Sequence, residues 1–207
     1  MNALGFTYRF EPARDPACRD TLLLLHGTGG DENDLMPLAE MVAPDAARLS
    51  PRGTVLEHGM PRYFRRIAEG VFDLEDLRLR TLELGAFVEH SFAAHGVDPR
   101  HVVALGYSNG ANIGWSLLLA RPELLAGAAL LRPMLPAVPA ALPDLGGRRV
   151  LVVAGESDPI APPEHAARLS AALASAGAAV TRHVSRAAHE LVREDVEALQ
   201  SWWNARG

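Results

Sequence analysis

Ser108 lies at the centre of a Gly-x-Ser-x-Gly pattern that spans residues 106–110. The mostly apolar residues 101–105 before it predict a buried strand, and residues 111–120 after it predict a well-packed helix. A serine on so tight a strand-to-helix turn projects its hydroxyl away from the backbone, and the two glycines avoid clashes that a Cβ would create. That geometry suits a nucleophile, so the pattern predicts acyl transfer at Ser108.

Two further reactive residues, Asp158 and His189, each follow a predicted strand, at 149–154 and 178–184 respectively. A carboxylate in the position of Asp158 can accept the Nδ1–H of an imidazole and fix its tautomer, while Nε2 takes the proton of the serine. The order serine, aspartate, histidine along the chain is the order of this strand–turn–helix architecture. The three residues therefore predict a catalytic triad.

Each of these two assignments has a rival close by. Glu156 lies two residues before Asp158, and a plain Asp-Pro turn is the interpretation without function. His183 competes with His189 but lies inside a predicted strand. We favour Asp158 because a loop must travel some distance beyond its strand before it can turn back, and His189 because a histidine inside a strand is more typical of a structural or solvated residue.

The segment 26–30, with the sequence His-Gly-Thr-Gly-Gly, follows a predicted strand at 21–25. Its glycines let backbone amides turn toward a developing negative charge, and a tetrahedral intermediate needs about two such donors, each worth about 3 kcal/mol. We assign the amides of Thr28 and Asn109 to this oxyanion hole, and we expect His26 to brace the loop. The alternative, a phosphate cradle, lacks its lysine, since all 20 basic residues are arginine.

Residues 52–72 are predicted as a long irregular stretch, and long loops in compact domains are usually functional. It combines apolar side chains with arginines, namely Met60, Tyr63, Phe64, Phe72, Arg62, Arg65 and Arg66. One interpretation is a pocket wall for an acyl or aromatic group, with an arginine meeting an anionic substituent; the other is a surface cap with a solvated arginine face. Arg132 and Met134, just after the predicted strand at 126–131, are expected to form the opposite wall.

Apolar runs typical of strands alternate with helical patterns along the whole chain. The strands are predicted at 6–10 (an edge strand), 21–25, 47–50, 101–105, 126–131, 149–154 and 178–184, and the helices at 34–42, 73–94, 111–120, 162–176 and 190–204. We expect Asp31 or Asn33 to cap the helix at 34–42, and Leu74 to begin the apolar stripe of the helix at 73–94. The alternation predicts the α/β class: a mostly parallel central sheet flanked by helices on both faces. The reactive residues would then meet at the carboxyl ends of its strands.

Composition excludes several classes of protein. A length of 207 residues with 48% hydrophobic content predicts a single domain over residues 1–207. A net charge of −5 argues against a nucleic-acid partner. We expect no membrane span, since no apolar stretch approaches about 20 residues, and no secretory leader, so a cytoplasmic location is the default. Cys18, the single cysteine, leaves no disulfide framework and no thiolate metal site.

Four segments together resemble the α/β-hydrolase fold, and more closely the small bacterial carboxylesterase/phospholipase family related to acyl-protein thioesterases. They are residues 26–30, 106–112, 155–160 and 188–191. The resemblance covers about residues 20 to 204. It implies a serine hydrolase with Ser108 as nucleophile, His189 as base and Asp158 as orienter, and a minimal core without the large lid of lipases. One departure is Ala188, where a glycine commonly precedes the histidine.

The function expected from these residues is the hydrolysis of carboxylic esters with small or medium acyl or aryl groups, through an acyl-enzyme intermediate. That route requires no metal and no organic cofactor. The expected binding partner of the protein is a small-molecule ester substrate. An acyl thioesterase or a lysophospholipase is the near alternative. A catalytically silent hydrolase-fold binding protein is the alternative from another class. Relatives of this compact build often associate, so the resemblance also makes a homodimer an expectation.

Overall fold

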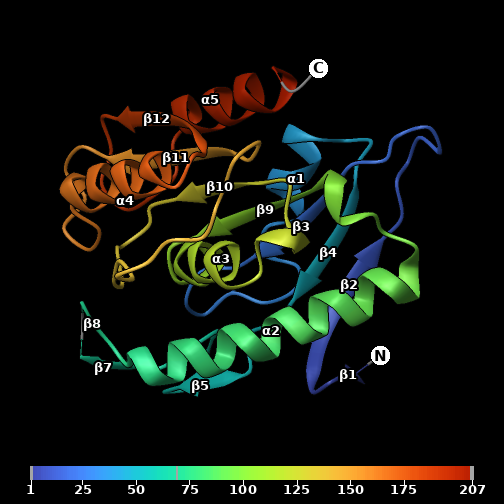
Figure 1. Ribbon diagram of the computed structural model, residues 1–207, viewed down its shortest axis with the longest axis horizontal. Coiled ribbons are helices and arrows are strands. Elements are labelled where there is room, and N and C mark those ends of the chain that lie inside the picture. Colours follow the sequence, from blue (N-terminus) through green and yellow to red (C-terminus); the bar gives the residue numbers. More distant parts are fainter. Residues whose placement is uncertain (1, 69, 206–207) are drawn as a thin grey trace.

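A computed structural model of the protein describes residues 2–68 and 70–205. The described residues form an eight-stranded sheet with the strand order β1-β2-β4-β3-β9-β10-β11-β12 (Figure 1). The strands are β1 (Asn2–Ala3), β2 (Phe6–Glu11), β3 (Thr21–Leu25), β4 (Ala47–Pro51), β9 (Val102–Tyr107), β10 (Gly127–Leu131), β11 (Arg149–Gly155) and β12 (Ala179–Ser185). From β4 to β12 neighbouring strands are parallel, whereas β2 runs antiparallel to β1 and to β4. The predicted mostly parallel sheet is therefore confirmed.

Helices cover both faces of the sheet. They are α1 (Met36–Val42), α2 (Leu74–His95), α3 (Asn109–Ala120), α4 (Pro163–Ser175) and α5 (Arg193–Asn204). In Figure 1, α1 and α5 lie above the sheet and α2 and α3 lie below it; α4 packs on the same side as α2 and α3. Among the described residues, no helix combines the length and the apolar character that crossing a lipid bilayer would require.

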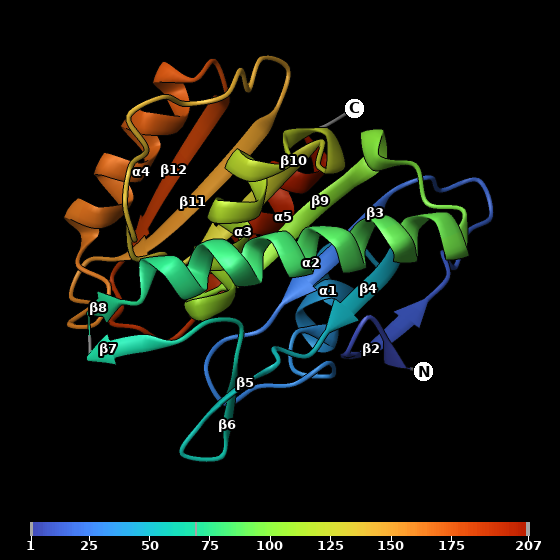
Figure 2. The ribbon, with the colours of Figure 1, turned by 60° about the horizontal axis from the view of Figure 1, so that its bottom comes forward.

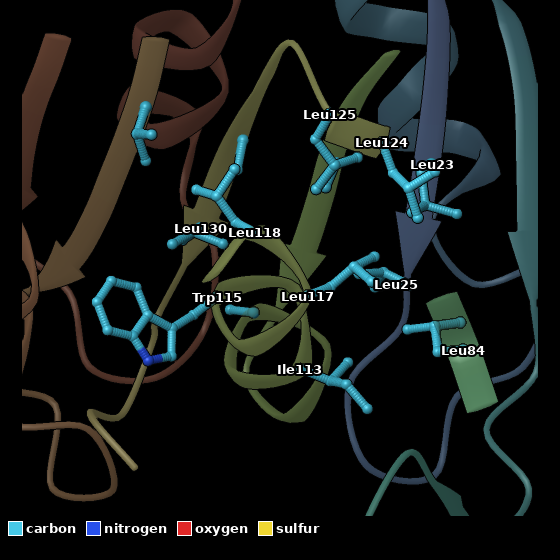
Figure 3. Packing of buried hydrophobic residues seen from close by; sticks show 14 of the residues in the cluster. Leu23, Leu25, Leu84, Ile113, Trp115, Leu117, Leu118, Leu124, Leu125 and Leu130 are labelled. Carbon is cyan, nitrogen blue, oxygen red and sulfur yellow. The ribbon is translucent and has the colours of Figure 1, made fainter. Parts of the chain in front are cut away.

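The two faces of the central strands fill two separate hydrophobic clusters. Leu23 and Leu25 of β3 pack into the cluster with α2, α3 and α4, whereas Leu22 and Leu24 pack into the cluster with α1 and α5. This division follows from the strand geometry, because successive side chains point to opposite faces. Since helices cover both faces, all five residues of β3 are buried, and the strand is apolar almost throughout. Figure 3 shows α3 at the centre of the larger cluster.

The beginning of α1 differs from the prediction. The helix begins at Met36 rather than at residue 34, and its N-cap is Leu35, which makes no capping hydrogen bond with its side chain. The expected cap by Asp31 or Asn33 is wrong, because Asp31 Oδ1 accepts a hydrogen bond from the Asn33 amide (2.8 Å) within the preceding turn. Pro37 in the first turn favours this start, since its missing N–H is one that needs no partner there.

Three other boundaries and positions also differ. The strand at 6–10 is not the edge of the sheet, because the two-residue strand β1 pairs with its outer side. Leu74 begins α2 but is 49% exposed, so it does not belong to the buried stripe that continues from Leu77. The last helix begins at Arg193 rather than at residue 190, because residues 188–190 form a loop whose carbonyl groups bind elsewhere.

The segment 52–72 is not irregular but contains two β-hairpins. Their strands are β5 (Val55–Glu57) and β6 (Met60–Arg62), then β7 (Arg66–Ala68) and β8 (Val71–Phe72). In Figure 2 the second hairpin (β7 and β8) lies beside the beginning of α2, whereas the first (β5 and β6) projects below the middle of the helix. The first hairpin turns at His58 and Gly59, which both have positive φ angles (52° and 80°). Two consecutive residues of this kind are the signature of a type I′ hairpin turn, so the His-Gly pair was the signal for this hairpin.

The turn from β9 to α3 brings three backbone segments into direct contact. Ser108 occupies it with φ 52° and ψ −112°, a left-handed conformation that costs a non-glycine residue energy. A Cβ on Gly106 would stand 2.5 Å from the Gly110 carbonyl oxygen, and one on Gly110 would stand 1.9 Å from the Leu25 carbonyl oxygen. Only glycines allow α3 to begin this close to β9 and β3.

We expect Gly110→Ala to destabilise the protein strongly, because its methyl group would overlap the backbone of β3. The overpacking should lower the free energy of unfolding by about 1–3 kcal/mol or more, measured by urea denaturation. Gly85→Ala in α2 is the matched control, since its methyl group would meet the flexible Arg121 side chain (3.3 Å). A Gly110→Ala protein with the wild-type urea midpoint would contradict this account of the turn.

Candidate active site

Ser108, His189 and Asp158 meet at the carboxyl ends of three parallel strands. Ser108 follows β9, Asp158 follows β11 and His189 follows β12. The His189 Nε2 atom lies 2.9 Å from Ser108 Oγ, and His189 Nδ1 lies 2.7 Å from Asp158 Oδ2. The structure thus joins three residues that are 50 and 31 positions apart in the chain into one line of hydrogen bonds.

The environment of Asp158 determines the direction of these hydrogen bonds. Its carboxyl group is buried, and its Oδ1 accepts hydrogen bonds from the amides of Ile160 (2.8 Å) and Ala161 (2.9 Å). A carboxylate only accepts hydrogen bonds, so the contact with His189 places the imidazole proton on Nδ1. Nε2 is then free to accept the hydroxyl proton of Ser108.

The two rival residues lie away from Ser108. The Glu156 side chain is exposed, and its backbone amide donates a hydrogen bond to the carbonyl of Ser185 (2.9 Å). His183 is in β12 with its Nε2 atom 3.7 Å from Asp195 Oδ1. Neither side chain reaches the group formed by Ser108, His189 and Asp158.

The loop that carries His189 is held at three successive carbonyl groups. Arg132 Nε donates a hydrogen bond to the Ala188 carbonyl (3.1 Å), and Arg132 Nη2 donates to the Glu190 carbonyl (2.8 Å). Between them, the hydroxyl of Tyr107 donates to the carbonyl of His189 itself (2.9 Å). The imidazole is thereby fixed through its own backbone by a residue next to Ser108.

The sequence analysis predicted that Arg132 forms a pocket wall, and this prediction is wrong. Arg132 lies fully buried beneath the His189 loop. Its guanidinium pairs with Asp195, with Nη2 2.6 Å from Oδ2, and Nη2 also donates a hydrogen bond to Ser185 Oγ (3.1 Å). These partners and the two loop carbonyls explain the burial, because a charge in the interior needs a counter-charge and satisfied hydrogen bonds. Like Ser108, Arg132 has a positive φ angle (53°).

Thr28 and Asn109 both border the same cavity as Ser108. Asn109 is the first residue of α3, where backbone N–H groups have no acceptor within the helix. The N–H group of Thr28 donates to no acceptor among the described residues. Both residues thus border the cavity with backbone amides that the described part of the fold does not use, and their role as an oxyanion hole stays a prediction.

The first hairpin and the residues before it brace the loop at 27–30. The Gly29 amide donates a hydrogen bond to the Pro61 carbonyl (2.9 Å), and Arg62 Nη1 donates to Thr28 Oγ1 (2.7 Å). His26 Nε2 accepts a hydrogen bond from the Gly53 amide (2.9 Å). The bracing role expected of His26 is thus visible in its contacts, and segment 53–62 shares it.

The cavity in front of Ser108 has a volume of about 240 Å³. Its polar lining residues are Thr28, Asn109, Asn112, Ser108 and His189, its apolar ones Phe72, Tyr107, Met134 and Ile160, and its basic ones Arg62 and Arg66; Gly70 also borders it. A larger depression of about 480 Å³ lies at the opposite ends of the strands, against Val103 and Arg149, and none of the three aligned residues borders it.

Of the residues predicted to contact the substrate, Met134 borders the cavity. Met60 does not; it is 39% exposed and lies over Gly29 of the neighbouring loop. Tyr63 and Phe64 are corrected as well, because both are buried in the core. Tyr63 donates its hydroxyl hydrogen to the Pro51 carbonyl (2.7 Å), which satisfies the one polar group of its buried ring.

Tyr107 and Asn112 border the cavity, although the sequence analysis assigned neither of them a role. Tyr107 is the variable residue before Ser108 in the Gly-x-Ser-x-Gly pattern, and Asn112 follows Ser108 by four residues, one helical turn. Asn112 Oδ1 accepts a hydrogen bond from the Met134 amide (2.8 Å), so it also positions the opposite wall. The signal that could have found them was their position, because Tyr107 directly precedes Ser108 and Asn112 lies one helical turn after it.

Comparison with known proteins extends over nearly the whole chain. The family described as phospholipase/carboxylesterase matches residues 10–205. The putative hydrolase MhqD of Bacillus subtilis is 43% identical over 184 residues, which cover 89% of this chain and 92% of MhqD. The crystal structure of the Bacillus cereus carboxylesterase superposes with a TM-score of 0.93 and 44% identity, covering 97% of this chain and 94% of that one. The carboxylesterase of Mesorhizobium loti gives a TM-score of 0.90 and 34% identity, covering 100% and 98%.

We expect the free energy of unfolding to decrease as the pH falls below about 6.5, and we expect His26 to contribute to this decrease. Burial lowers the pKa of His26, so the folded state favours the neutral imidazole, and its contribution is complete above the ordinary pKa and is lost as the pH falls toward the folded value. Urea unfolding at pH 7.5 and 5.5 should show a smaller loss for His26→Gln than for the wild type. His90→Gln, at an exposed position, should keep the wild-type slope. Identical slopes in all three proteins would refute this.

Replacing Arg132 by Met should lower the free energy of unfolding by about 3–5 kcal/mol, because it leaves the Asp195 carboxylate buried without its counter-charge. Urea denaturation measures the loss. Arg65→Met removes an arginine whose side chain is 60% exposed and should cost about 1 kcal/mol or less. The double variant Arg132→Met/Asp195→Leu should recover much of the loss. A single variant as stable as the Arg65→Met control would show that the pair does not act as described.

Proposed function

The chain belongs to the phospholipase/carboxylesterase family and is an esterase-type hydrolase, and we propose that it acts through a serine nucleophile, Ser108. The observation that carries this proposal is the line of contacts from Ser108 Oγ to His189 Nε2 (2.9 Å) and from His189 Nδ1 to Asp158 Oδ2 (2.7 Å). A serine, a histidine and a carboxylate in this arrangement can supply a nucleophile, a general base and an orienting group.

In the proposed reaction, His189 Nε2 takes the hydroxyl proton while Ser108 Oγ attacks the ester carbonyl carbon. The oxygen of the tetrahedral intermediate accepts hydrogen bonds from the amides of Thr28 and Asn109. His189 then gives the proton to the departing alcohol as the ester C–O bond breaks, which leaves an acyl group on Ser108. Water, deprotonated by His189, repeats the attack and releases the acid.

Asp158 keeps the imidazole in the required tautomer throughout this cycle. Its Oδ2 accepts the Nδ1 hydrogen, and its charge stabilises the imidazolium that forms when Nε2 is protonated. The amides of Ile160 and Ala161 hold the other carboxylate oxygen, so the carboxyl group cannot rotate away from His189. This arrangement supports the role of a positioning carboxylate rather than of a proton acceptor.

The substrates that we propose are esters with small or medium acyl or aryl groups. The cavity of about 240 Å³ supports this size, since pockets for drug-sized ligands enclose about 300–1,000 Å³. Its apolar side, with Phe72 and Met134, suits a short hydrocarbon or an aromatic ring. Chain-length profiles on p-nitrophenyl esters, acyl thioesters and lysophospholipids separate this proposal from a thioesterase or a lysophospholipase.

Replacing Ser108 by Ala should lower kcat on p-nitrophenyl butyrate by a factor of about 10⁴ or more, because the attacking oxygen is lost. The melting temperature should change little, since the substitution removes one partly exposed hydroxyl. Ser116→Ala, on the same helix, is the matched control and should retain activity. A fluorophosphonate probe should label the wild type and not Ser108→Ala.

Comparable turnover by the Ser108→Ala protein would exclude Ser108 as the nucleophile. A folded wild-type protein that neither turns over esters nor reacts with the fluorophosphonate would instead be a hydrolase-fold binding protein.

A further inference from the structure

Two arginines from the hairpins border the same cavity as Ser108, namely Arg62 at the end of β6 and Arg66 at the beginning of β7. Ester hydrolysis by itself needs no positive charge at this wall, because backbone amides suffice for the oxyanion. Among the described residues that border the cavity, none is an aspartate or a glutamate. The wall is therefore basic on the side that faces the substrate.

A single carboxylate serves both guanidinium groups. Glu57 Oε1 lies 2.8 Å from Arg66 Nε, and Glu57 Oε2 lies 3.1 Å from Arg62 Nε. The hydrogen bond from Arg66 lowers the pKa of Glu57, so this group is a charged carboxylate at neutral pH. Among these three described residues, two positive charges and one negative charge leave one positive charge at this wall of the cavity.

The two arginines differ in what remains available to a ligand. Arg62 is buried, and it donates to the Phe64 carbonyl (3.2 Å) through Nε and to Thr28 Oγ1 (2.7 Å) through Nη1. Arg66 is 29% exposed in its side chain, and its Nη1 and Nη2 atoms make no hydrogen bond to a described residue. Arg62 thus belongs to the framework of the site, whereas Arg66 offers free donors.

The negative charge of Asp158 does not cancel this wall. Asp158 lies buried behind His189, and its two oxygens are occupied by the amides of Ile160 and Ala161 and by His189 Nδ1. The Arg132–Asp195 pair beneath the same loop is neutral as a unit. Within the described part of the chain, the uncompensated charge therefore remains with Arg66, on the hairpin side.

We propose that the preferred substrates carry a carboxylate in addition to the ester, and that Arg66 binds this carboxylate. This inference rests on the proposed function of Ser108 and specifies its substrate class. The terminal nitrogens of a guanidinium form a planar fork that matches the two oxygens of a carboxylate, and such charge-assisted pairs are about twice as strong as neutral hydrogen bonds. The small volume of the cavity places a second group of a short substrate within reach of its walls.

The carboxylate can belong to the acyl part or to the alcohol part of the ester, and two pairs of substrates separate these cases. Mono-p-nitrophenyl glutarate and p-nitrophenyl pentanoate share a five-carbon acyl chain, but only the first carries a carboxylate on it. For the alcohol part, 4-acetoxybenzoate is compared with its methyl ester. The Ser108→Ala protein measures the spontaneous hydrolysis to be subtracted.

The measured quantity is the ratio of kcat/KM for the charged substrate to kcat/KM for its neutral partner. Arg66→Gln should lower this ratio about tenfold or more in at least one pair, because the hydrogen bonds to the charged group are lost. Arg65→Gln removes the same charge from the adjacent position, which does not border the cavity, and should leave the ratio unchanged. Glu57→Gln removes the shared carboxylate and should raise the ratio. Added NaCl should lower the wild-type ratio through screening.

An unchanged ratio for Arg66→Gln in both pairs, or an equal loss for charged and neutral substrates, would overturn the inference and leave Arg66 a structural partner of Glu57. A Glu57→Gln ratio that does not rise would overturn it as well, even if Arg66→Gln failed to fold. These outcomes leave the proposed function intact as long as the wild type cleaves the neutral esters. Failure of the wild type on all four esters would count against the proposed function itself.

Discussion

The buried guanidinium of Arg132 is the group on which the arrangement at this rim of the sheet depends. A charge that is completely removed from water must be matched by a counter-charge and by hydrogen-bond acceptors. Asp195 supplies the counter-charge from the first turn of α5, and the Ala188 and Glu190 carbonyls supply acceptors on either side of His189. One side chain from the end of β10 therefore couples the start of the last helix to the loop of the proposed general base.

The first hairpin and the residues before it likewise link segments that are distant in sequence. The Pro61 carbonyl accepts a hydrogen bond from the Gly29 amide, and Arg62 holds the Thr28 side chain. The proposed oxyanion donor is therefore fixed by a segment that is distant in sequence. The amide of Tyr63 donates to Asn109 Oδ1 (2.8 Å), which links that segment to the beginning of α3 as well. Thr28 and Asn109 are thus positioned by contacts with a distant segment as well as by their own elements.

Most of the fold could be predicted because its strongest signals are local. A strand that is buried on both faces has to be apolar along its whole length, and β3 and β10 were recognised on that basis. Helix boundaries depend on weaker competing interactions: Asp31 serves the turn before α1 instead of its cap, and the last helix begins late because the preceding residues bind Arg132. The hairpins were missed because their strands are only two or three residues long, although His58-Gly59 marked one turn.

By itself, the sequence determined the order of the elements and the place of Ser108, Asp158 and His189 just beyond the ends of parallel strands, because strand length, apolar content and glycine at a tight turn are properties of neighbouring residues. Only the tertiary structure decided which side chains of the segment 52–72 and of the end of β10 face the cavity. Arg132, Tyr63 and Phe64 turn inward, whereas Arg66 and Phe72 border it. That outcome depends on where buried charges find partners and where rings find space, and both are set by residues that lie far apart along the chain.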